Sequence, residues 1–129
     1  MKPKPRLLVV DNEMDVCNFV KSFFDLRGFD VMTAFNGDEA MKVLDSVKPD
    51  IVILDVMMRR EDEGLEFLPK IKKKAPGAKV IMITGVDDKD IIEQAKKLGA
   101  DDYITKPLVL EYLESTVMGK VSNLSRVKH

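Results

Sequence analysis

Five short runs of apolar residues alternate along the chain with longer stretches in which apolar residues recur every three or four positions. The apolar runs predict buried β-strands, and the helical spacing between them predicts amphipathic helices. The predicted strands are residues 6–10, 29–34, 50–54, 78–84 and 101–105. Strands separated by a helix favour βαβ units and a parallel sheet covered on both faces. The pattern therefore predicts an open, doubly wound α/β domain with a five-stranded parallel sheet.

The first and last predicted helices carry the clearest apolar stripes. The expected core positions of the first helix are Val16, Phe19, Val20 and Phe23. The stripe of the last helix consists of Leu110, Leu113, Val117, Val121 and Leu124. Leu124 lies beyond the expected end of the sheet, so a weak homodimer through the face of the fourth helix, fifth strand and last helix and a monomer with a frayed C-terminus both remain open.

Length and composition fit one soluble globular domain. The 129 residues are 45% hydrophobic and 33% charged with a net charge of −1, which indicates no bulk attraction to nucleic acid or membranes. The N-terminal segment is too short and too charged for a signal peptide, so a cytoplasmic location is expected. We expect a single domain over 1–129, with its core at about 5–122 and a tail or the start of a linker at 123–129.

Single residues exclude most familiar catalytic sites. Cys17 is the only cysteine, and His129 is the only histidine and the last residue. Internal disulfides, Ser-His-Asp triads and cysteine or histidine metal clusters are therefore excluded, unless a frayed terminus contributes. No glycines form a dinucleotide fingerprint or a Walker A loop. Cys17 itself is expected to be a small buried side chain.

Polar side chains follow the carboxyl ends of four predicted strands. They are Asp11, Asn12, Asp55, Thr84 and Lys106. Ligands of open α/β sheets bind at this edge, where the strand order reverses. A single residue of this kind would be a helix cap, but five polar groups converging from four strands indicate a functional site.

The chemistry of these residues suits phosphoryl transfer. Asp55 can act as a nucleophile toward phosphorus and form an acyl phosphate. Asp11 and Asp55 offer the hard oxygen ligands that Mg²⁺ prefers. Lys106 can neutralise the charge of the transferring group, and Thr84 can donate a hydrogen bond to it.

The chain resembles the receiver domain of two-component response regulators, the flavodoxin-like family that includes the chemotaxis receiver. The matching segments are "LLVVDNE", "PDIVILDVMM", "VIMITG" and "GADDYITKPL", in family order and at family spacing. The resemblance covers about residues 5–122 and implies a (βα)5 flavodoxin-like sandwich. Each matching segment alone is a weak indication of this family, but the four segments together are very specific for it.

The resemblance also implies roles for individual residues. It makes Asp55 the phosphoacceptor, Thr84 the switch hydroxyl, Lys106 the phosphate-sensing lysine and Tyr103 the aromatic switch. Asp11, Asn12, Asp55 and the main-chain carbonyl of Met57 would be metal ligands, and Lys106–Pro107 would be a cis peptide. A histidine kinase or phosphotransfer protein would donate the phosphate. The surface of the fourth helix, fifth strand and last helix would then change for an unknown downstream protein.

The sequence departs from the family pattern near the expected metal. Asn12 stands where the family has an acid, so Mg²⁺ binding is expected to be weak. Glu13 is expected to point into the start of the first helix rather than to compensate. Arg59 replaces a usual proline and Gly64 comes one residue late, so "RREDEG" is expected to be a solvated surface loop.

Other residues have simpler interpretations. Met57 and Val86 flank the family's path for attacking water, and their apolar side chains predict slow loss of phosphate. Met57 and Met58 are otherwise expected to fill the core. Lys70, Lys72, Lys73 and Lys74 are expected on an exposed helix face rather than at nucleic acid.

Three functions follow from this sequence in decreasing order of support. The first is a phosphorylatable receiver that acts as a signalling switch rather than as an enzyme. The second is a degenerate receiver that docks proteins without phosphate, for which Asn12 is the main support. The third, a small α/β hydrolase or mutase, lacks a general base and a second acidic motif.

Overall fold

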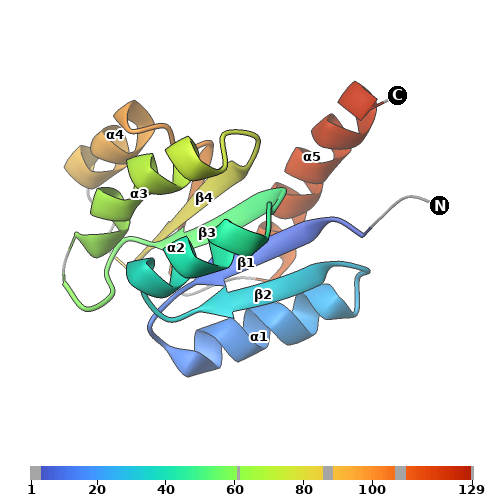
Figure 1. Ribbon diagram of the computed structural model, residues 1–129, viewed down its shortest axis with the longest axis horizontal. Coiled ribbons are helices and arrows are strands. Elements are labelled where there is room, and N and C mark those ends of the chain that lie inside the picture. The colour runs from blue at the N-terminus through green and yellow to red at the C-terminus, as the bar shows by residue number, and fades with distance from the viewer. Residues whose placement is uncertain (1–3, 61, 86–88, 107–109, 129) are drawn as a thin grey trace.

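The fold is a five-stranded parallel sheet between two layers of helices, as the sequence pattern predicts. The computed structural model describes residues 4–60, 62–85, 89–106 and 110–128 (Figure 1). The strands are β1 (Arg6–Val10), β2 (Asp30–Ala34), β3 (Ile51–Asp55), β4 (Lys79–Thr84) and β5 (Asp102–Thr105). The helices are α1 (Met14–Asp25), α2 (Gly37–Ser46), α3 (Glu63–Lys74), α4 (Lys89–Lys97) and α5 (Leu110–Lys128).

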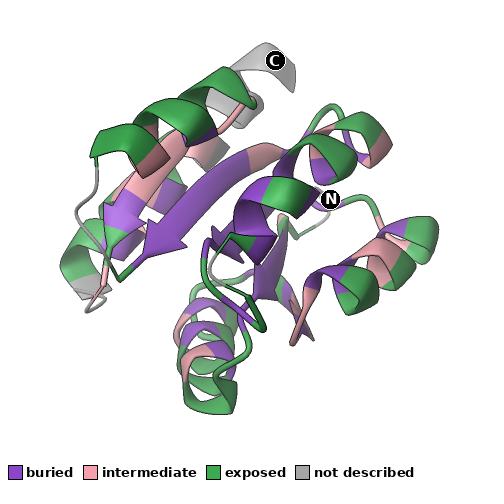
Figure 2. Ribbon diagram, turned by 90° about the vertical axis from the view of Figure 1, so that its left-hand side faces the viewer, coloured by how far each residue is buried: buried purple, intermediate pink, exposed green. Residues whose placement is uncertain are grey.

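The sheet order is β2-β1-β3-β4-β5, and every pair of neighbours is parallel. The first crossover moves outward from β1 to β2, and the chain then returns to the other side of β1. The strand order therefore reverses between β1 and β3, which is where a doubly wound sheet places its ligand site. All five residues of β3 are buried, so this central strand fixes the position of the residue that ends it. Figure 2 shows that the strands are mostly buried, whereas the helices carry exposed outer faces.

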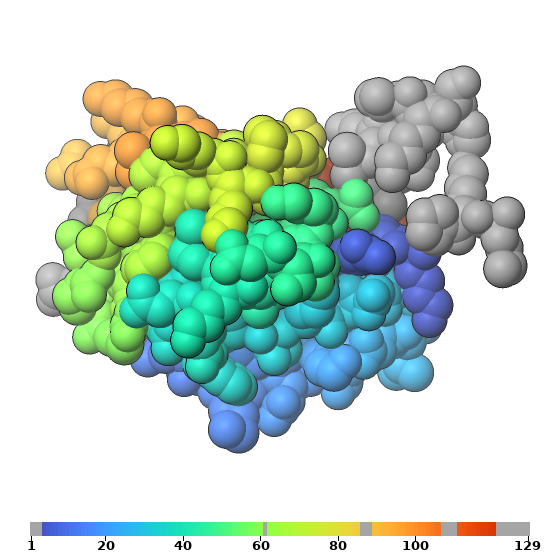
Figure 3. Space-filling model, viewed as in Figure 1, coloured from blue at the N-terminus to red at the C-terminus, as the bar shows by residue number. Residues whose placement is uncertain are grey.

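Two apolar clusters hold the helices against the sheet. One face of the sheet packs on α1 and α5, whose buried residues include Cys17, Val20, Phe24, Leu113 and Val117. The other face packs on α2, α3 and α4. Side chains of α2 and α3 meet over this second face (Figure 3). Among the described residues no helix is both long and apolar enough to cross a membrane.

The buried face of α1 differs from the expected one. Cys17, Val20 and Phe24 are fully buried, whereas Phe19 is 43% exposed. Positions 17, 20 and 24 share one face of a helix, and position 19 lies to its side. The ring of Phe24 also packs edge-on against Phe29 at 5.1 Å between centroids. The prediction that Phe19 belongs to the core is therefore wrong.

The start of α2 is fixed by a capping box. The Asn36 side chain accepts a hydrogen bond from Glu39 N at 2.9 Å, and the Glu39 carboxylate accepts one from Phe35 N at 2.7 Å. This reciprocal pair satisfies main-chain donors that have no partner inside the helix. It leaves the N–H of Gly37 directed toward α3, where a buried side chain accepts it.

In the last helix, Leu113 and Val117 are buried as predicted. The side chains of Leu110, Val121 and Leu124 lie outside the described residues, as does Pro107 with its expected cis peptide. The expected basic face of α3 is only partly solvated. Lys70 and Lys73 are exposed, whereas Lys72 contacts Asp101 at 2.8 Å and Lys74 forms an ion pair with Asp45.

Candidate functional site

The structure brings the polar residues of the strand ends together. Asp55 is the last residue of β3, Thr84 is the last of β4, and Asp11 and Lys106 directly follow β1 and β5. Asp11, Asp55 and Thr84 are each at most 2% exposed. Lys106 Nζ lies 3.1 Å from Asp55 Oδ2 and 3.2 Å from Asp11 Oδ2. A single ammonium group therefore bridges two buried carboxylates.

The main chain ties Lys106 to β4. Its N–H donates to the carbonyl of Thr84 at 2.7 Å, which continues the ladder between β4 and β5 past the last paired residues. Thr84 is fully buried at the same edge of the sheet as Asp55. Tyr103 lies two strand positions before Thr105, half-buried, and lines a pocket with Ile92, Ala95 and Lys96 of α4. It therefore sits on the surface expected to switch.

Burial and like charge govern the ionisation of Asp55. Burial in the sheet edge and the neighbouring charge of Asp11 raise the pKa of Asp55 to about 7, although Lys106 acts in the opposite direction. Burial disfavours the charged form of Lys106, but the charges of Asp55 and Asp11 outweigh it and raise the pKa of the ammonium. The lysine thus stays protonated beside the acids.

Asp11 and Asp55 are the carboxylates at this edge that could hold Mg²⁺. Among the described residues, no group of three or more acidic, cysteine or histidine side chains is arranged to hold a metal. In the same part of the chain, the buried Asp11 Oδ2 has no hydrogen-bond partner, although Lys106 Nζ lies 3.2 Å away as an ion pair. Since Mg²⁺ commonly binds through one or two carboxylates and keeps several waters, Asp11 and Asp55 fit it.

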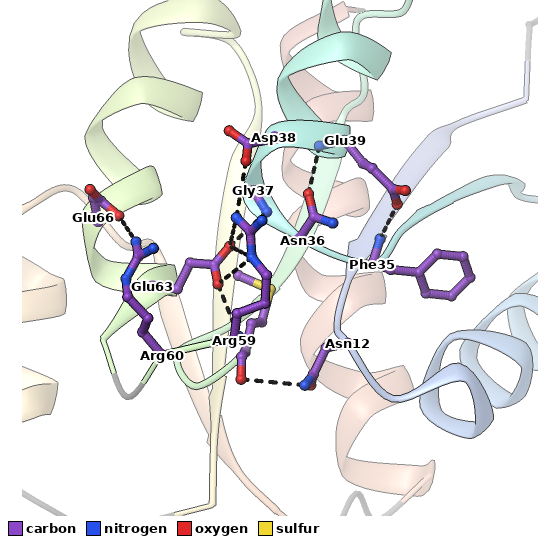
Figure 4. Close-up of polar contacts among 11 residues, drawn as sticks. Asn12, Phe35, Asn36, Gly37, Asp38, Glu39, Arg59, Arg60, Glu63 and Glu66 are labelled. Atoms are coloured by element: carbon purple, nitrogen blue, oxygen red, sulfur yellow. Dashed lines mark hydrogen bonds and ion pairs between the residues drawn. The ribbon is translucent and has the colours of Figure 1, made fainter.

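Asn12 is directed at a neighbouring loop. Its Nδ2 donates to the carbonyl oxygen of Met58 at 3.3 Å (Figure 4). The side chain joins the β1–α1 loop to the β3–α3 loop through protein atoms alone. An aspartate could not donate this hydrogen bond, so the amide has a role here that the family acid would not fill.

Glu13 does not point into the start of α1, and that prediction is wrong. Its Oε1 lies 3.2 Å from Lys106 Nζ, and it makes no side-chain hydrogen bond to the helix terminus. Glu13 is the N-cap residue of α1 and has the extended backbone usual there, at φ −89° and ψ 112°, but its side chain reaches Lys106 instead of the helix N–H groups. Lys106 therefore contacts three carboxylates, of which only Glu13 is exposed.

The loop after Asp55 is not simply solvated, which corrects a second prediction. Arg59 and Arg60 are exposed, but Glu63 at the end of the loop is fully buried. Gly64 follows, and a Cβ at that position would lie 2.0 Å from the carbonyl oxygen of Asp55. The end of the loop therefore packs directly against the backbone at the end of β3.

The two methionines of this loop differ from each other. Met58 is buried as expected for core filling, but Met57 is 39% exposed. The N–H of Met57 donates to Asp55 Oδ1 at 3.3 Å, which directs the chain outward after β3. Met57 therefore lies beside the Asp55 carboxylate, and its role in water access stays a prediction, while Val86 lies outside the described residues.

Comparison with known proteins agrees with this geometry. The family model of the response regulator receiver domain matches residues 7–118. The chemotaxis protein CheY of Listeria monocytogenes is 44% identical over 114 residues, which cover 84% of this chain and 95% of that protein. The alkaline phosphatase synthesis transcriptional regulatory protein PhoP of Bacillus subtilis is 35% identical over 102 residues, covering 79% of this chain and 42% of that protein.

Solved structures show the same architecture. A CheY-like response regulator receiver domain protein from Methanospirillum hungatei has a TM-score of 0.89 at 26% identity. The match covers 95% of this chain and 98% of the chain of that protein. A response regulator protein from Burkholderia pseudomallei, solved with a phosphorylated aspartic acid, a calcium ion and citrate, has a TM-score of 0.83 at 26% identity, covering 96% and 72%. The chain belongs to the response regulator receiver domain family.

Proposed function

We propose that this receiver domain accepts a phosphoryl group on Asp55 from a histidine kinase or a phosphotransfer protein. Receiver domains are signalling switches and generally bind Mg²⁺. The observation that carries the proposal is the buried Asp11–Lys106–Asp55 contact at the carboxyl edge of the sheet. The Burkholderia pseudomallei relative, whose structure holds a phosphorylated aspartic acid, supports it.

In the proposed reaction, an oxygen of ionised Asp55 attacks the phosphorus of the donor. A new O–P bond forms as the N–P bond of phosphohistidine breaks, and the imidazole nitrogen keeps the electron pair of the broken bond. Lys106 lies 3.1 Å from the attacking carboxylate and can neutralise charge on the phosphoryl oxygens. Asp11 and Asp55 would hold Mg²⁺, whose positive charge would neutralise further charge on those oxygens.

Thr84 and Tyr103 are proposed to pass the change to the surface. Thr84 would bind the new phosphoryl group through its hydroxyl, and Tyr103 would respond within the pocket between β5 and α4. We place the output on the surface formed by α4, β5 and α5, which an unknown downstream protein would bind. Action in the cytoplasm is part of the same proposal.

Intact mass spectrometry tests the acceptor. Incubation with acetyl phosphate and Mg²⁺ should add one phosphoryl group to the wild type and none to Asp55→Asn. Asp15→Asn is the matched control, because Asp15 is exposed on α1 and should leave the modification unchanged. A modified D55N protein would contradict the assignment of Asp55.

The second candidate is a receiver that docks proteins without phosphorylation. The direction of Asn12 favours it, because the amide donates to Met58 and brings no negative charge to the cation. A wild-type protein that stays unmodified in ample Mg²⁺ would support this candidate against the first.

We further propose that the phosphorylated form is long-lived. The exposed Met57 beside Asp55 has no group that could orient a water molecule for attack on phosphorus. Met57→Asn combined with Val86→Glu should therefore speed the loss of phosphate at saturating Mg²⁺. Rapid loss from the wild type without a phosphatase would contradict this proposal.

A further inference from the structure

A second buried carboxylate, Glu63, lies at the far end of the loop that follows Asp55. It is fully buried, and its oxygens accept hydrogen bonds from Gly37 N at 3.1 Å and from Arg59 N at 2.9 Å. The Arg59 guanidinium also donates to it, with Nη2 at 2.7 Å from Oε2. We call Glu63, Arg59, Gly37 and Asp38 the Glu63 clamp (Figure 4).

The Glu63 clamp joins the start of α2 to the start of α3 and the loop that precedes α3. Glu63 begins α3, Gly37 begins α2, and Arg59 belongs to the β3–α3 loop. Arg59 Nη2 also contacts Asp38 Oδ2 at 3.1 Å, so the guanidinium bridges α2 and α3. Because both main-chain and side-chain donors of Arg59 are held, the clamp fixes the backbone of the loop at this residue.

The loop is held on its other sides as well. The N–H of Gly64 donates to the carbonyl of Val56 at 2.8 Å, and Asn12 donates to the carbonyl of Met58. Between these fixed points lies Met57, whose N–H donates to Asp55 Oδ1. The four residues after Asp55 therefore have little freedom to move relative to its carboxylate.

We propose that Glu63 is a positioning residue for the acceptor site, holding the Met57 main chain in the place where it serves Asp55 and the cation. The inference rests on the proposed function, because it assumes that a cation binds beside Asp55. Arg59 stands where the resemblance leads one to expect a proline, which would restrict the loop through its ring. The clamp supplies the same restriction through ionic hydrogen bonds.

A purely structural role would have a different signature. It would lower the free energy of unfolding when removed, but the folded fraction would bind the cation unchanged. A positioning role predicts weaker cation binding in protein that remains folded, because the backbone near Asp55 is then less well placed. Cation affinity measured without any phosphodonor separates the two.

The experiment compares Glu63→Gln with Glu66→Gln. Glu66 is the matched control, because it lies on the same helix and forms an ion pair with Arg60 of the same loop, but is exposed. Arg59→Gln is the second variant, since Arg59 is half exposed and its replacement poses less risk to folding. Mg²⁺ affinity is measured by titration monitored by NMR, and amide hydrogen exchange is followed at Met57, Arg59 and Gly37.

We expect Glu63→Gln to weaken Mg²⁺ binding about tenfold and Arg59→Gln to weaken it by a smaller factor, with Glu66→Gln unchanged. Amide exchange at Met57 should speed up in the first two variants only. Unchanged affinity and exchange in folded Glu63→Gln, or in Arg59→Gln if the first variant does not fold, would overturn the proposal. Failure of wild-type phosphorylation would instead contradict the proposed function. The Mg²⁺ affinities and amide exchange rates are measured without a phosphodonor and would still decide whether Glu63 positions the site.

Discussion

The molecule holds two buried carboxylates at the two ends of one loop, and their environments drive them in opposite directions. Burial and the charge of Asp11 raise the pKa of Asp55 to about 7. Hydrogen bonds from the Arg59 side chain, together with the N–H groups of Gly37 and Arg59, lower the pKa of Glu63 to about 2. Both acids are shielded from solvent, but the negative charge of Asp11 acts on Asp55, whereas a guanidinium and two N–H donors act on Glu63.

This difference separates a fully compensated carboxylate, Glu63, from a less compensated one, Asp55. Glu63 accepts hydrogen bonds from two main-chain N–H groups and a guanidinium, so its negative charge is compensated by groups of the protein itself. Asp55 accepts hydrogen bonds from the Lys106 ammonium and, at 3.3 Å, from the N–H of Met57, and it shares the lysine with Asp11. A carboxylate that is incompletely compensated retains capacity to bind a cation or a phosphoryl group.

The largest expected effect comes from the glycine that directly follows Glu63 and lies against the backbone of Asp55. Gly64→Ala would place a Cβ 2.0 Å from the carbonyl oxygen of Asp55 and 2.6 Å from the Cα of Val56. We expect a loss of about 3 kcal/mol in the free energy of unfolding, because main chain on both sides must shift. Urea denaturation measures it, with Gly77→Ala as the control because nothing lies within 4 Å of the new methyl group. Equal stability of the two variants would show that the loop yields freely.

The comparison of the two carboxylates also predicts a pH dependence. The folded-state pKa of Glu63, about 2, lies below its ordinary value, so ionised Glu63 stabilises the fold above roughly pH 4.3 and this contribution is lost as the pH falls toward 2. Wild type should therefore exceed Glu63→Gln in stability by about 2 kcal/mol near pH 6. The gap should close on acidification, as urea denaturation of both proteins at several pH values can show. A gap independent of pH would mean that the charge of Glu63 is not its source.

The smallest expected effect concerns the link between the two loops. Asn12→Asp removes the hydrogen bond to Met58 and adds a charge near Asp11, so stability without metal should fall by about 1 kcal/mol. The added carboxylate should also tighten Mg²⁺ binding about fivefold. Asn18→Asp, the same change at an exposed position of α1, serves as the control. Unchanged Mg²⁺ affinity would show that residue 12 continues to face Met58 rather than the cation.

Much of the fold and the edge of the site could be predicted from the sequence, because strand ends define both. The apolar run that ends at Asp55 indicates a central strand, and Asp11, Thr84 and Lys106 occupy the equivalent ends of other strands. Parallel pairing brings such positions to one edge whatever the details of packing. The contact of Lys106 with both acids follows from this rule.

The Glu63 clamp could not be predicted in the same way. In "RREDEG" every residue before the glycine is charged, and periodicity does not show which carboxylate is buried. The available signal was Gly64, since a glycine after a run of charged residues favours a close backbone approach, here to the carbonyl oxygen of Asp55. The direction of Glu13 likewise depends on where the fold places Lys106, which a local sequence pattern does not specify.

The reactivity of the buried Cys17 thiol can be used to measure local opening of the structure. The thiol is fully buried, donates to the carbonyl of Asp11 at 3.3 Å, and has a pKa that burial and the charge of Asp11 raise to about 11. A thiol in this state does not react with a disulfide reagent until the α1 layer separates from the sheet. Cys17 is the only cysteine in the chain. The rate at which a thiol reagent labels it therefore measures how often the structure opens next to Asp11, at the carboxyl end of β1.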